Sequence, residues 1–160
     1  IRDSRISSPC AAIAIGSEMS GGVANVTVMD STLWDSTAGV HIKSGPGRGG
    51  YVHDVLLENL IMKDCAEAIM IDLEDSKEPP DDPTHKVNLS ALPDIRRVRA
   101  RHINGTGSIT VAKLEGLKGA VIHDVELEDM HFDGGQYVCG NVTGTFHDVT
   151  PQPCADIRPH

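Results

Sequence analysis

Aliphatic and polar residues recur along this chain at related intervals. In four stretches a valine lies four residues before a polar position, and these pairs are Val26 and Asp30, Val55 and Asn59, Val98 and His102, and Val125 and Asp129. The four valines are separated by 29, 43 and 27 residues, and Asp3 takes the corresponding polar place before the first full copy. A second strand-like stretch follows in each copy, at residues 13–15, 40–42, 69–71 and 109–111. The chain is therefore interpreted as a series of similar structural units.

The pattern predicts strands rather than helices, because no segment of twelve or more residues keeps a helical period. Short strands broken by Gly and Asn/Asp turns are typical of a solenoid whose successive turns stack in parallel. A β-sandwich is the alternative, but a sandwich does not require a constant repeat length. We therefore predict an all-β, right-handed parallel β-helix in which the recurring Asp and Asn residues serve turn and ladder hydrogen bonding.

The long interval of 43 residues is explained by an insertion from about residue 74 to residue 93, which is rich in Pro and Asp. Proline lacks an N–H group and restricts the residue before it, so this segment is predicted to be a loop. Residues 1–160 are expected to form a single β-helix domain. Because Ile1 falls in the middle of the pattern, we expect a fragment that is incomplete at its N-terminal end.

Composition and charge narrow the possible partners. Aromatic residues make up only 3% of the chain, which suits many small stacked layers better than one large core. The formal charge is -9, and protonation of all eight histidines would bring it to -9 + 8 = -1, so an anionic ligand is tolerated best in acid. A nucleic-acid-binding protein is normally basic, which argues against that partner. No run of about 18 apolar residues occurs, so no membrane span is expected, and we expect a monomer.

Four N-x-S/T sequons are present, at Asn25, Asn88, Asn104 and Asn141. Any one of them can arise by chance, but together they favour a secreted glycoprotein. The four cysteines show no CxxC spacing, and neither a metal nor a cofactor is expected. Cys139 and Cys154 close a short loop and are a candidate disulfide in an oxidising compartment, with buried free thiols as the alternative.

The main candidate for chemistry is the pair His41 and Lys43. The two residues are separated by one position on a predicted strand, so both side chains leave the same face, while Val40 and Ile42 point inward. A glycine-rich turn over residues 44–51 follows and contains Arg48, a lesser candidate. Two cations on a rigid strand suit an anionic ligand such as a carboxylate, although a solvated outer face has the same pattern.

Two other groups of polar residues have simpler explanations. Glu18 lies in a turn between coils and is expected to anchor that turn through backbone N–H groups. The remaining histidines show no paired metal spacing and are expected to be surface groups; these are His53, His85, His102, His123, His131, His147 and His160.

Several segments resemble glycoside hydrolase family 28, the polygalacturonase family, in its plant-type C-terminal portion. These segments are IAIGSEMSGGV at 13–23, GVHIK at 39–43, GRGGY at 47–51, Leu92-Pro93, CGNVTG at 139–144 and PQPC at 151–154. The resemblance implies a right-handed parallel β-helix. It also implies inverting hydrolysis of α-1,4-galacturonosyl bonds in pectin by a protein secreted to the extracellular space or cell wall.

The resemblance assigns roles to particular residues. The family's R-I-K motif, which binds the galacturonate carboxylate, matches residues 41–43, so His41 stands in place of Arg and Lys43 keeps its type. Histidine lacks the bidentate fork of arginine and donates a charged hydrogen bond only when protonated, which makes binding more acid-dependent. Ala11 aligns with the histidine of the family's G-H-G motif.

No catalytic residue is assigned in this chain. The family's three aspartates lie in an N-T-D motif and a D-D motif, both upstream of the GSE segment. Here Asp3 has no preceding Asp, and Asp81-Asp82 belongs to the insertion. We therefore expect the catalytic aspartates upstream of Ile1, with this chain contributing the carboxylate-binding half and being inactive alone. The alternative is a non-catalytic β-helical module that binds acidic polysaccharide.

Overall fold

The computed structural model describes residues 1–74 and 89–160, and its named strands pair only in parallel. The strands are β1 (Arg5–Ile15), β2 (Val23–Lys43), β3 (Tyr51–Asp72), β4 (Asp94–Thr106), β5 (Thr110–Glu115), β6 (Ile122–Phe132), β7 (Gln136–Gly140), β8 (Val142–Thr150) and β9 (Ile157–Pro159). Within the described ranges, no helix has the length and apolar character needed to cross a bilayer.

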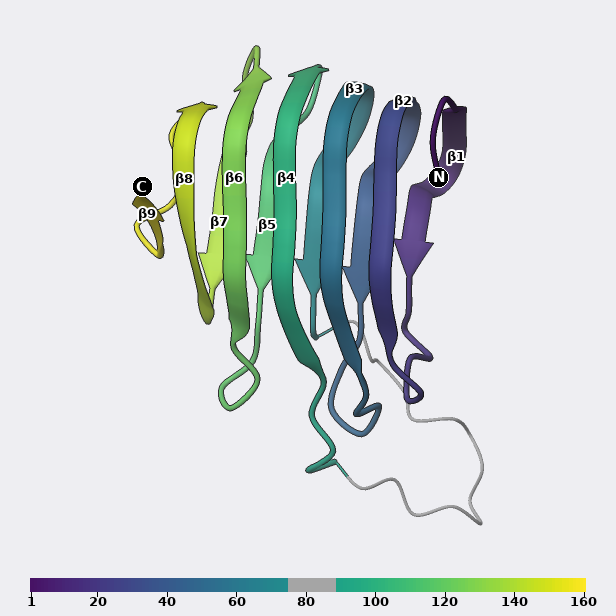
Figure 1. Ribbon diagram of the computed structural model, residues 1–160, viewed down its shortest axis with the longest axis vertical. Coiled ribbons are helices and arrows are strands. Elements are labelled where there is room, and N and C mark those ends of the chain that lie inside the picture. The colour runs from purple at the N-terminus through teal and green to yellow at the C-terminus, as the bar shows by residue number, and fades with distance from the viewer. Residues whose placement is uncertain (75–88) are drawn as a thin grey trace.

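The chain winds as a solenoid (Figure 1). Each coil rises through the front layer, bends over the top and descends through the rear layer, while the chain advances from the N-terminal side to the C-terminal side. β2 and β3 make this path as single long strands, whereas later coils divide it between β4 and β5 and between β6 and β7. The strand order is β1-β2-β3-β4-β6-β8-β9, with β5 paired to β3 and β7. The fold is the right-handed parallel β-helix that the sequence predicts.

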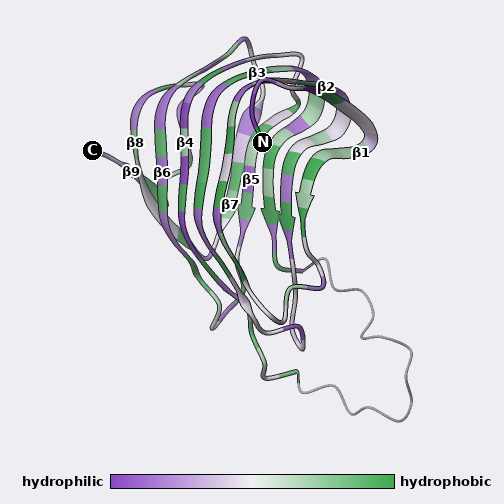
Figure 2. Ribbon diagram, turned by 45° about the vertical axis from the view of Figure 1, so that its right-hand side comes forward, coloured by the Kyte–Doolittle hydropathy of each residue, from purple (hydrophilic) through white to green (hydrophobic). Residues whose placement is uncertain are grey.

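The predicted valine repeat is confirmed as a structural register. Val26 pairs with Val55, Val55 with Val98, and Val98 with Val125, so these residues form one column across four coils. Hydrophobic and hydrophilic residues alternate along the strands (Figure 2), because successive side chains point to opposite faces. The inward aliphatic side chains form one continuous core, whose fully buried members include Leu33, Leu57, Ile71, Ile103 and Ile122.

The second predicted column is correct over three coils and wrong in the fourth. Ile13 pairs with Val40 and Val40 with Ile69, but the next partner is Ala112 rather than Ile109. Ile109 is 71% exposed, and its backbone N–H donates a hydrogen bond to the carbonyl of Ala66 in β3. The length of the corner before β5 is not encoded in a local pattern, and the corner places the in-register residue three positions later than expected.

Polar residues with left-handed backbone form one corner column. Its members have φ values between 47° and 54° and are Asp3, Asp30, Asn59, His102, Asp129 and Asp148. Asn and Asp tolerate this conformation better than other non-glycine residues. Neighbouring members also bond to one another: Asn59 Nδ2 donates to Asp30 Oδ1 at 2.7 Å, and His102 Nδ1 lies 2.7 Å from Asp129 Oδ2. These bonds are the ladder that the recurring polar positions predicted.

A second corner column contains Asn25, Asp54, Arg97 and Asp124, with φ values between 53° and 59°. The Arg97 guanidinium donates to both carboxylate oxygens of Asp54, at 2.7 and 2.9 Å. This hydrogen-bonded ion pair, reinforced by His53, lowers the pKa of Asp54 well below its usual range although burial acts in the opposite direction. The contact joins β3 to β4 and holds an arginine in a conformation that arginine seldom adopts.

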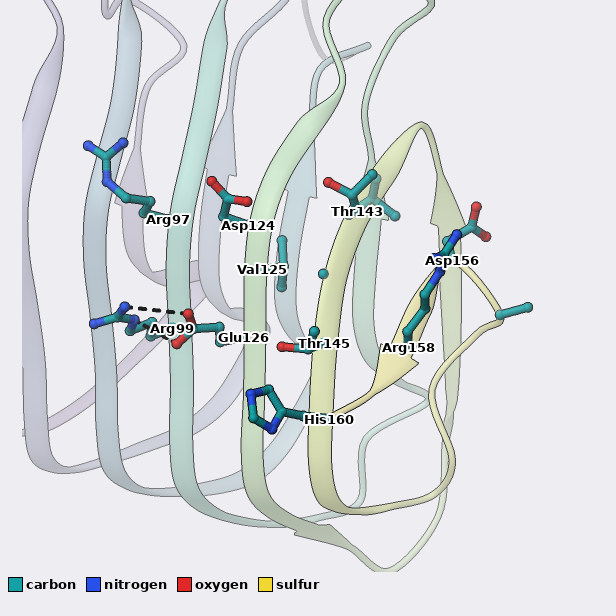
Figure 3. A pocket seen from close by; sticks show the side chains of 13 residues that line it. Arg97, Arg99, Asp124, Val125, Glu126, Thr143, Thr145, Asp156, Arg158 and His160 are labelled. Atoms are coloured by element: carbon teal, nitrogen blue, oxygen red, sulfur yellow. Dashed lines mark hydrogen bonds and ion pairs between the residues drawn. The ribbon is translucent and has the colours of Figure 1, made fainter.

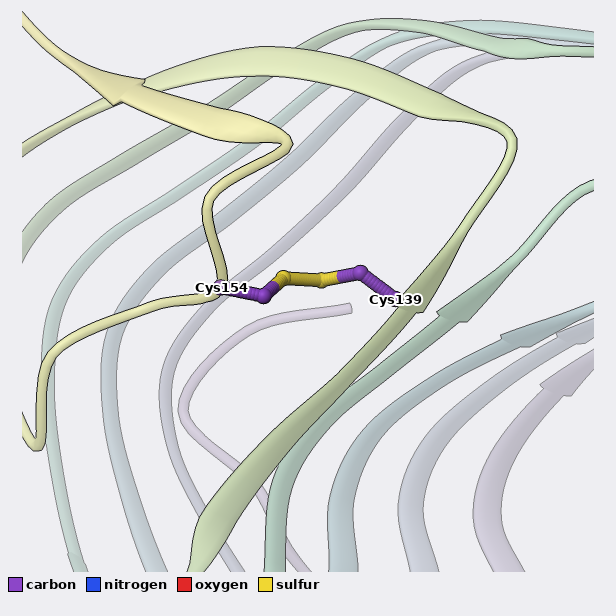
Figure 4. The surroundings of a disulfide bond; sticks show 2 residues. All are labelled: Cys139 and Cys154. Carbon is purple, nitrogen blue, oxygen red and sulfur yellow. A yellow bond between two sulfur atoms is a disulfide. The ribbon is translucent and has the colours of Figure 1, made fainter.

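The last coil carries a covalent link. Cys139 of β7 is joined to Cys154, which precedes β9, and their Cα atoms lie 6.3 Å apart (Figure 4). This is the cysteine pair that the sequence indicated. Cys10 is exposed and Cys65 is buried, and neither forms a disulfide with a described cysteine. The C-terminal segment is thereby tied across the end of the core.

Arg97 allows a test of the corner geometry. Arg97→Gly and Arg97→Ala both remove the Asp54 ion pair, but only glycine adopts a φ of 53° without steric cost. We expect the Gly variant to be more stable than the Ala variant by about 1 kcal/mol in urea unfolding.

The matched control is Arg99, two residues along the same strand, where Ala should be more stable than Gly because the strand interior penalises glycine. If the same one of the two variants, Gly or Ala, were the more stable at both Arg97 and Arg99, the result would contradict the corner conformation assigned to Arg97.

Candidate functional site

The structure places His41 and Lys43 on the outer surface of the last part of β2. Their inward neighbours Val40 and Ile42 are each only 1% exposed, while His41 and Lys43 are half-buried. The preceding coil approaches closely here, since a Cβ added to Gly16 would collide with the carbonyl oxygen of Lys43. The two cations therefore stand on a fixed strand and share one face, in the arrangement expected from their spacing.

Three charged residues in the following coils were missed by sequence reasoning. Asp72 of β3 pairs in register with Lys43, Glu115 of β5 pairs with Asp72, and Lys113 stands beside Met70. Lys113 Nζ lies 3.0 Å from Asp72 Oδ2 and 3.1 Å from Glu115 Oε2. Burial alone would lower the pKa of Lys113, but the contacts with these two carboxylates raise it overall.

The sequence contained a signal for these residues. Asp72 follows Lys43 by 29 residues and Glu115 follows Asp72 by 43, which are the intervals between the valines of the core column. Asp72 is only 8% exposed, and its second oxygen accepts a hydrogen bond from the backbone N–H of Glu74 at 2.8 Å. The carboxylate of Asp72 is thus satisfied within the protein, and the charge of Lys113 is committed to it.

The two glycine-rich loops that precede β2 and β3 stack on each other. A Cβ on Gly22 would enter the ring of Tyr51, and a Cβ on Gly50 would meet the backbone of Met19. Across this stack Arg48 Nη1 lies 3.3 Å from Glu18 Oε1. Glu18 therefore contacts the next loop through its carboxylate, a different role from the backbone anchor expected of it.

A hollow of ≈ 810 Å³ lies on another face, between β4, β6, β8 and the C-terminal segment (Figure 3). Neither His41 nor Lys43 lines it. Its charged side chains are three arginines and three acids, namely Arg97, Arg99, Arg158, Asp124, Glu126 and Asp156. Arg99 is paired with Glu126 at 2.7 Å, and Arg97 is paired with Asp54. With its cations balanced by acids in this way, the hollow is a poorer match for a polyanion than the β2 strand.

One histidine is less isolated than expected. Asp129, His131 and Asp148 each offer a ligand atom within 4.8 Å of the others, on the outer surface of β6 and β8. The hydrogen bond from His102, supported by that from His131, lowers the pKa of Asp129. Asp129 and His131 are two residues apart on β6, and the stacking of coils brings Asp148 of β8 beside them.

Three of the four sequon asparagines lie within the described residues. Asn25, Asn104 and Asn141 occupy exposed positions, and Asn141 Nδ2 donates to the carbonyl of Gly116 at 3.2 Å. Asn88 lies outside the described residues, as do Asp81-Asp82 and most of the predicted insertion.

Comparison with known proteins agrees with this architecture. A family model described as "Glycosyl hydrolases family 28" matches residues 7–152. A "Probable polygalacturonase" of Vitis vinifera is 31% identical over 158 residues, covering 95% of this chain and 31% of that protein. An "Endo-polygalacturonase" of Pectobacterium carotovorum subsp. carotovorum is 43% identical over 60 residues, covering 38% of this chain and 15% of that protein.

A solved structure shares the fold. The crystal structure of a hyperthermoactive exopolygalacturonase from Thermotoga maritima superimposes with a TM-score of 0.78 at 21% identity, covering 99% of this chain and 33% of that chain. The chain spans about a third of the length of the Vitis relative and of this structure.

The Lys113 ion pairs generate a stability prediction. Lys113→Met leaves the buried Asp72 carboxylate without its cation, and we expect a loss of about 2 kcal/mol in the free energy of unfolding. The double variant Lys113→Met/Asp72→Asn should recover part of that loss because the uncompensated charge is gone.

Lys118→Met provides the control, because Lys118 is exposed. Its effect on unfolding should stay within about 0.5 kcal/mol. A similar effect of both lysine substitutions would show that the Asp72 contact contributes no stability.

Proposed function

Because the chain belongs to glycosyl hydrolases family 28, we propose that it is part of a pectin-degrading enzyme that hydrolyses α-1,4-galacturonosyl bonds with inversion. The observation that carries the proposal is the outward pair His41 and Lys43 on β2, directly before the glycine-rich loop that leads to β3. In this proposal the pair binds the carboxylate of a galacturonate unit. Lys43 supplies a fixed cation, and His41 adds a charged hydrogen bond when protonated.

The neighbouring charges support a defined carboxylate subsite. On the next coil Asp72 occupies the position beside Lys43 and pairs with Lys113. The charge of Lys113 is therefore directed to Asp72 rather than to a ligand. In this proposal the cationic surface offered to the substrate is confined to β2. A bound polysaccharide would place one carboxylate over β2 rather than spread its charge along the whole sheet.

In this proposal the catalytic step uses family aspartates, none of which is assigned to a residue of this chain. An inverting glycosidase uses a carboxylic acid to protonate the leaving oxygen and a carboxylate about 6.5–9.5 Å away to activate water. Neighbouring coils are about 4.8 Å apart and alternate coils about twice that, so the backbone separations of stacked aspartates bracket the required distance. We place these aspartates on coils that would precede β1, in line with β2, so that this chain forms the carboxylate-binding half of the cleft.

We further propose that the protein is secreted to the extracellular space or cell wall and is glycosylated. The Cys139–Cys154 disulfide supports an oxidising compartment. The exposed positions of Asn25, Asn104 and Asn141 support accessible glycosylation sites.

Hydrolysis provides the direct test. The protein that contains this chain should release reducing ends from polygalacturonate at about pH 5, where histidine is charged. Each bond cleaved creates one new reducing end, so the assay counts turnovers. Binding of polygalacturonate without any release would reject the hydrolase proposal and favour a non-catalytic module that binds acidic polysaccharide, which is the second candidate because this sequence contains no N-T-D motif.

Substitution separates the strand from the loop as the anchor. Lys43→Ala should weaken oligogalacturonate binding by roughly 10-fold or more, the usual value of a charged hydrogen bond. Arg48→Ala should weaken it less than about threefold, because the Arg48 side chain is only 17% exposed and is paired with Glu18. Isothermal titration with a galacturonate oligomer measures both. Equal losses in the two variants would show that β2 is not the anchor.

A further inference from the structure

A cluster of metal-ligating side chains lies away from the proposed carboxylate site. His131 Nε2 is 2.9 Å from Asp129 Oδ1 and 3.8 Å from Asp148 Oδ2. Asp129 and His131 belong to β6, and Asp148 belongs to β8 on the next coil. One ligand atom from each of the three residues lies within 4.8 Å of the others. We call this set the His–Asp cluster.

The β-helix register creates the cluster. Asp129 and Asp148 are successive members of a corner column, with φ values of 47° and 49°, so their carboxylates leave the surface side by side. His131 follows Asp129 by two positions and therefore points to the same face. Two carboxylates and one imidazole converge, although Asp148 is far from Asp129 and His131 in the sequence.

We propose that Asp129, His131 and Asp148 bind a divalent transition-metal ion of the zinc class. Zinc binds imidazole nitrogen and carboxylate oxygen at about 2.0–2.2 Å, so two ligand atoms of a tetrahedral ion lie about 3.4 Å apart. The two separations from His131 Nε2, 2.9 and 3.8 Å, bracket that value, and the two carboxylate ligand atoms lie within 4.8 Å of each other. Water completes the coordination, since His131 is 41% exposed and Asp148 is 64% exposed, which also leaves an open path for the ion.

His102 prepares the cluster for this role. Its Nδ1 lies 2.7 Å from Asp129 Oδ2, so one oxygen of Asp129 is held by β4 and the other faces His131. Carboxylates that ligate a metal are usually held by hydrogen bonds from residues outside the ligand set. Metal binding replaces the present Asp129–His131 hydrogen bond, and the Nε2 lone pair of a neutral imidazole becomes the ligand. His102 acts here as a positioning residue.

The site would link successive coils. A metal ion held by β6 and β8 adds a cross-link near the C-terminal end of the solenoid. It stabilises the folded state by a free energy that grows with the logarithm of the free metal concentration. This role is independent of the hydrolase activity, because the cluster uses neither His41 nor Lys43.

Zinc titration tests the proposal. Tag-free protein containing this chain is treated with a chelator, dialysed, and titrated with ZnCl₂ in a calorimeter. We expect one zinc ion to bind the wild type with a dissociation constant below about 10 μM. His131→Ala and Asp148→Asn should each weaken that event at least 10-fold, and His102→Ala should weaken it by a smaller factor. Zinc should also raise the Tm of the wild type but not that of His131→Ala.

His123→Ala is the matched control, since His123 is an exposed histidine of the same strand outside the cluster. It should leave zinc binding unchanged. The His131→Ala substitution removes an exposed side chain, and its unchanged Tm without zinc would verify folding. Absence of binding in the wild type, or binding that survives both His131→Ala and Asp148→Asn, would overturn the proposal and identify the cluster as a hydrogen-bonded ion-pair network only.

Discussion

The parallel, in-register stacking of coils is the constraint on which this structure depends. Backbone hydrogen bonds join equivalent positions of successive coils about 4.8 Å apart, so every residue has its counterparts as nearest neighbours. The column of Val26, Val55, Val98 and Val125 is the direct result. A slip of one residue would exchange inward and outward faces along a whole strand, and the buried aliphatic core prevents it.

Stacking also explains the chemistry of the corners. A coil must turn sharply, and the turning residue adopts a left-handed conformation that favours Asn and Asp. Because the same corner recurs in every coil, acidic residues would face one another in a column and repel. At three steps the structure places a different partner beside an acid: Asn59 bonds to Asp30, Arg97 to Asp54, and His102 to Asp129. Asp129 and Asp148 remain acidic neighbours. The same arrangement, with His131 added, produces the proposed metal site.

On the flat outer surface, stacking distributes charge between strands. Lys43 on β2 is followed by Asp72 on β3 and Glu115 on β5, and Lys113 binds both acids. Both acids on the later coils thus share one lysine, while β2 carries Lys43 and His41. If the chain binds pectin as we propose, this order of charges directs a galacturonate carboxylate to β2, beside the stacked glycine-rich loops.

Sequence alone determined the repeat, the solenoid and the shared face of His41 and Lys43. These follow from periods and alternation, which are properties of a single strand or interval. Tertiary structure decided what lies between coils. It determined that Ala112, and not Ile109, pairs with Ile69. The length of a corner determines where the next strand begins, and no local pattern in the sequence encodes that length. Tertiary structure also joined Lys113 to Asp72, since the reach of a side chain across neighbouring strands depends on their register in space.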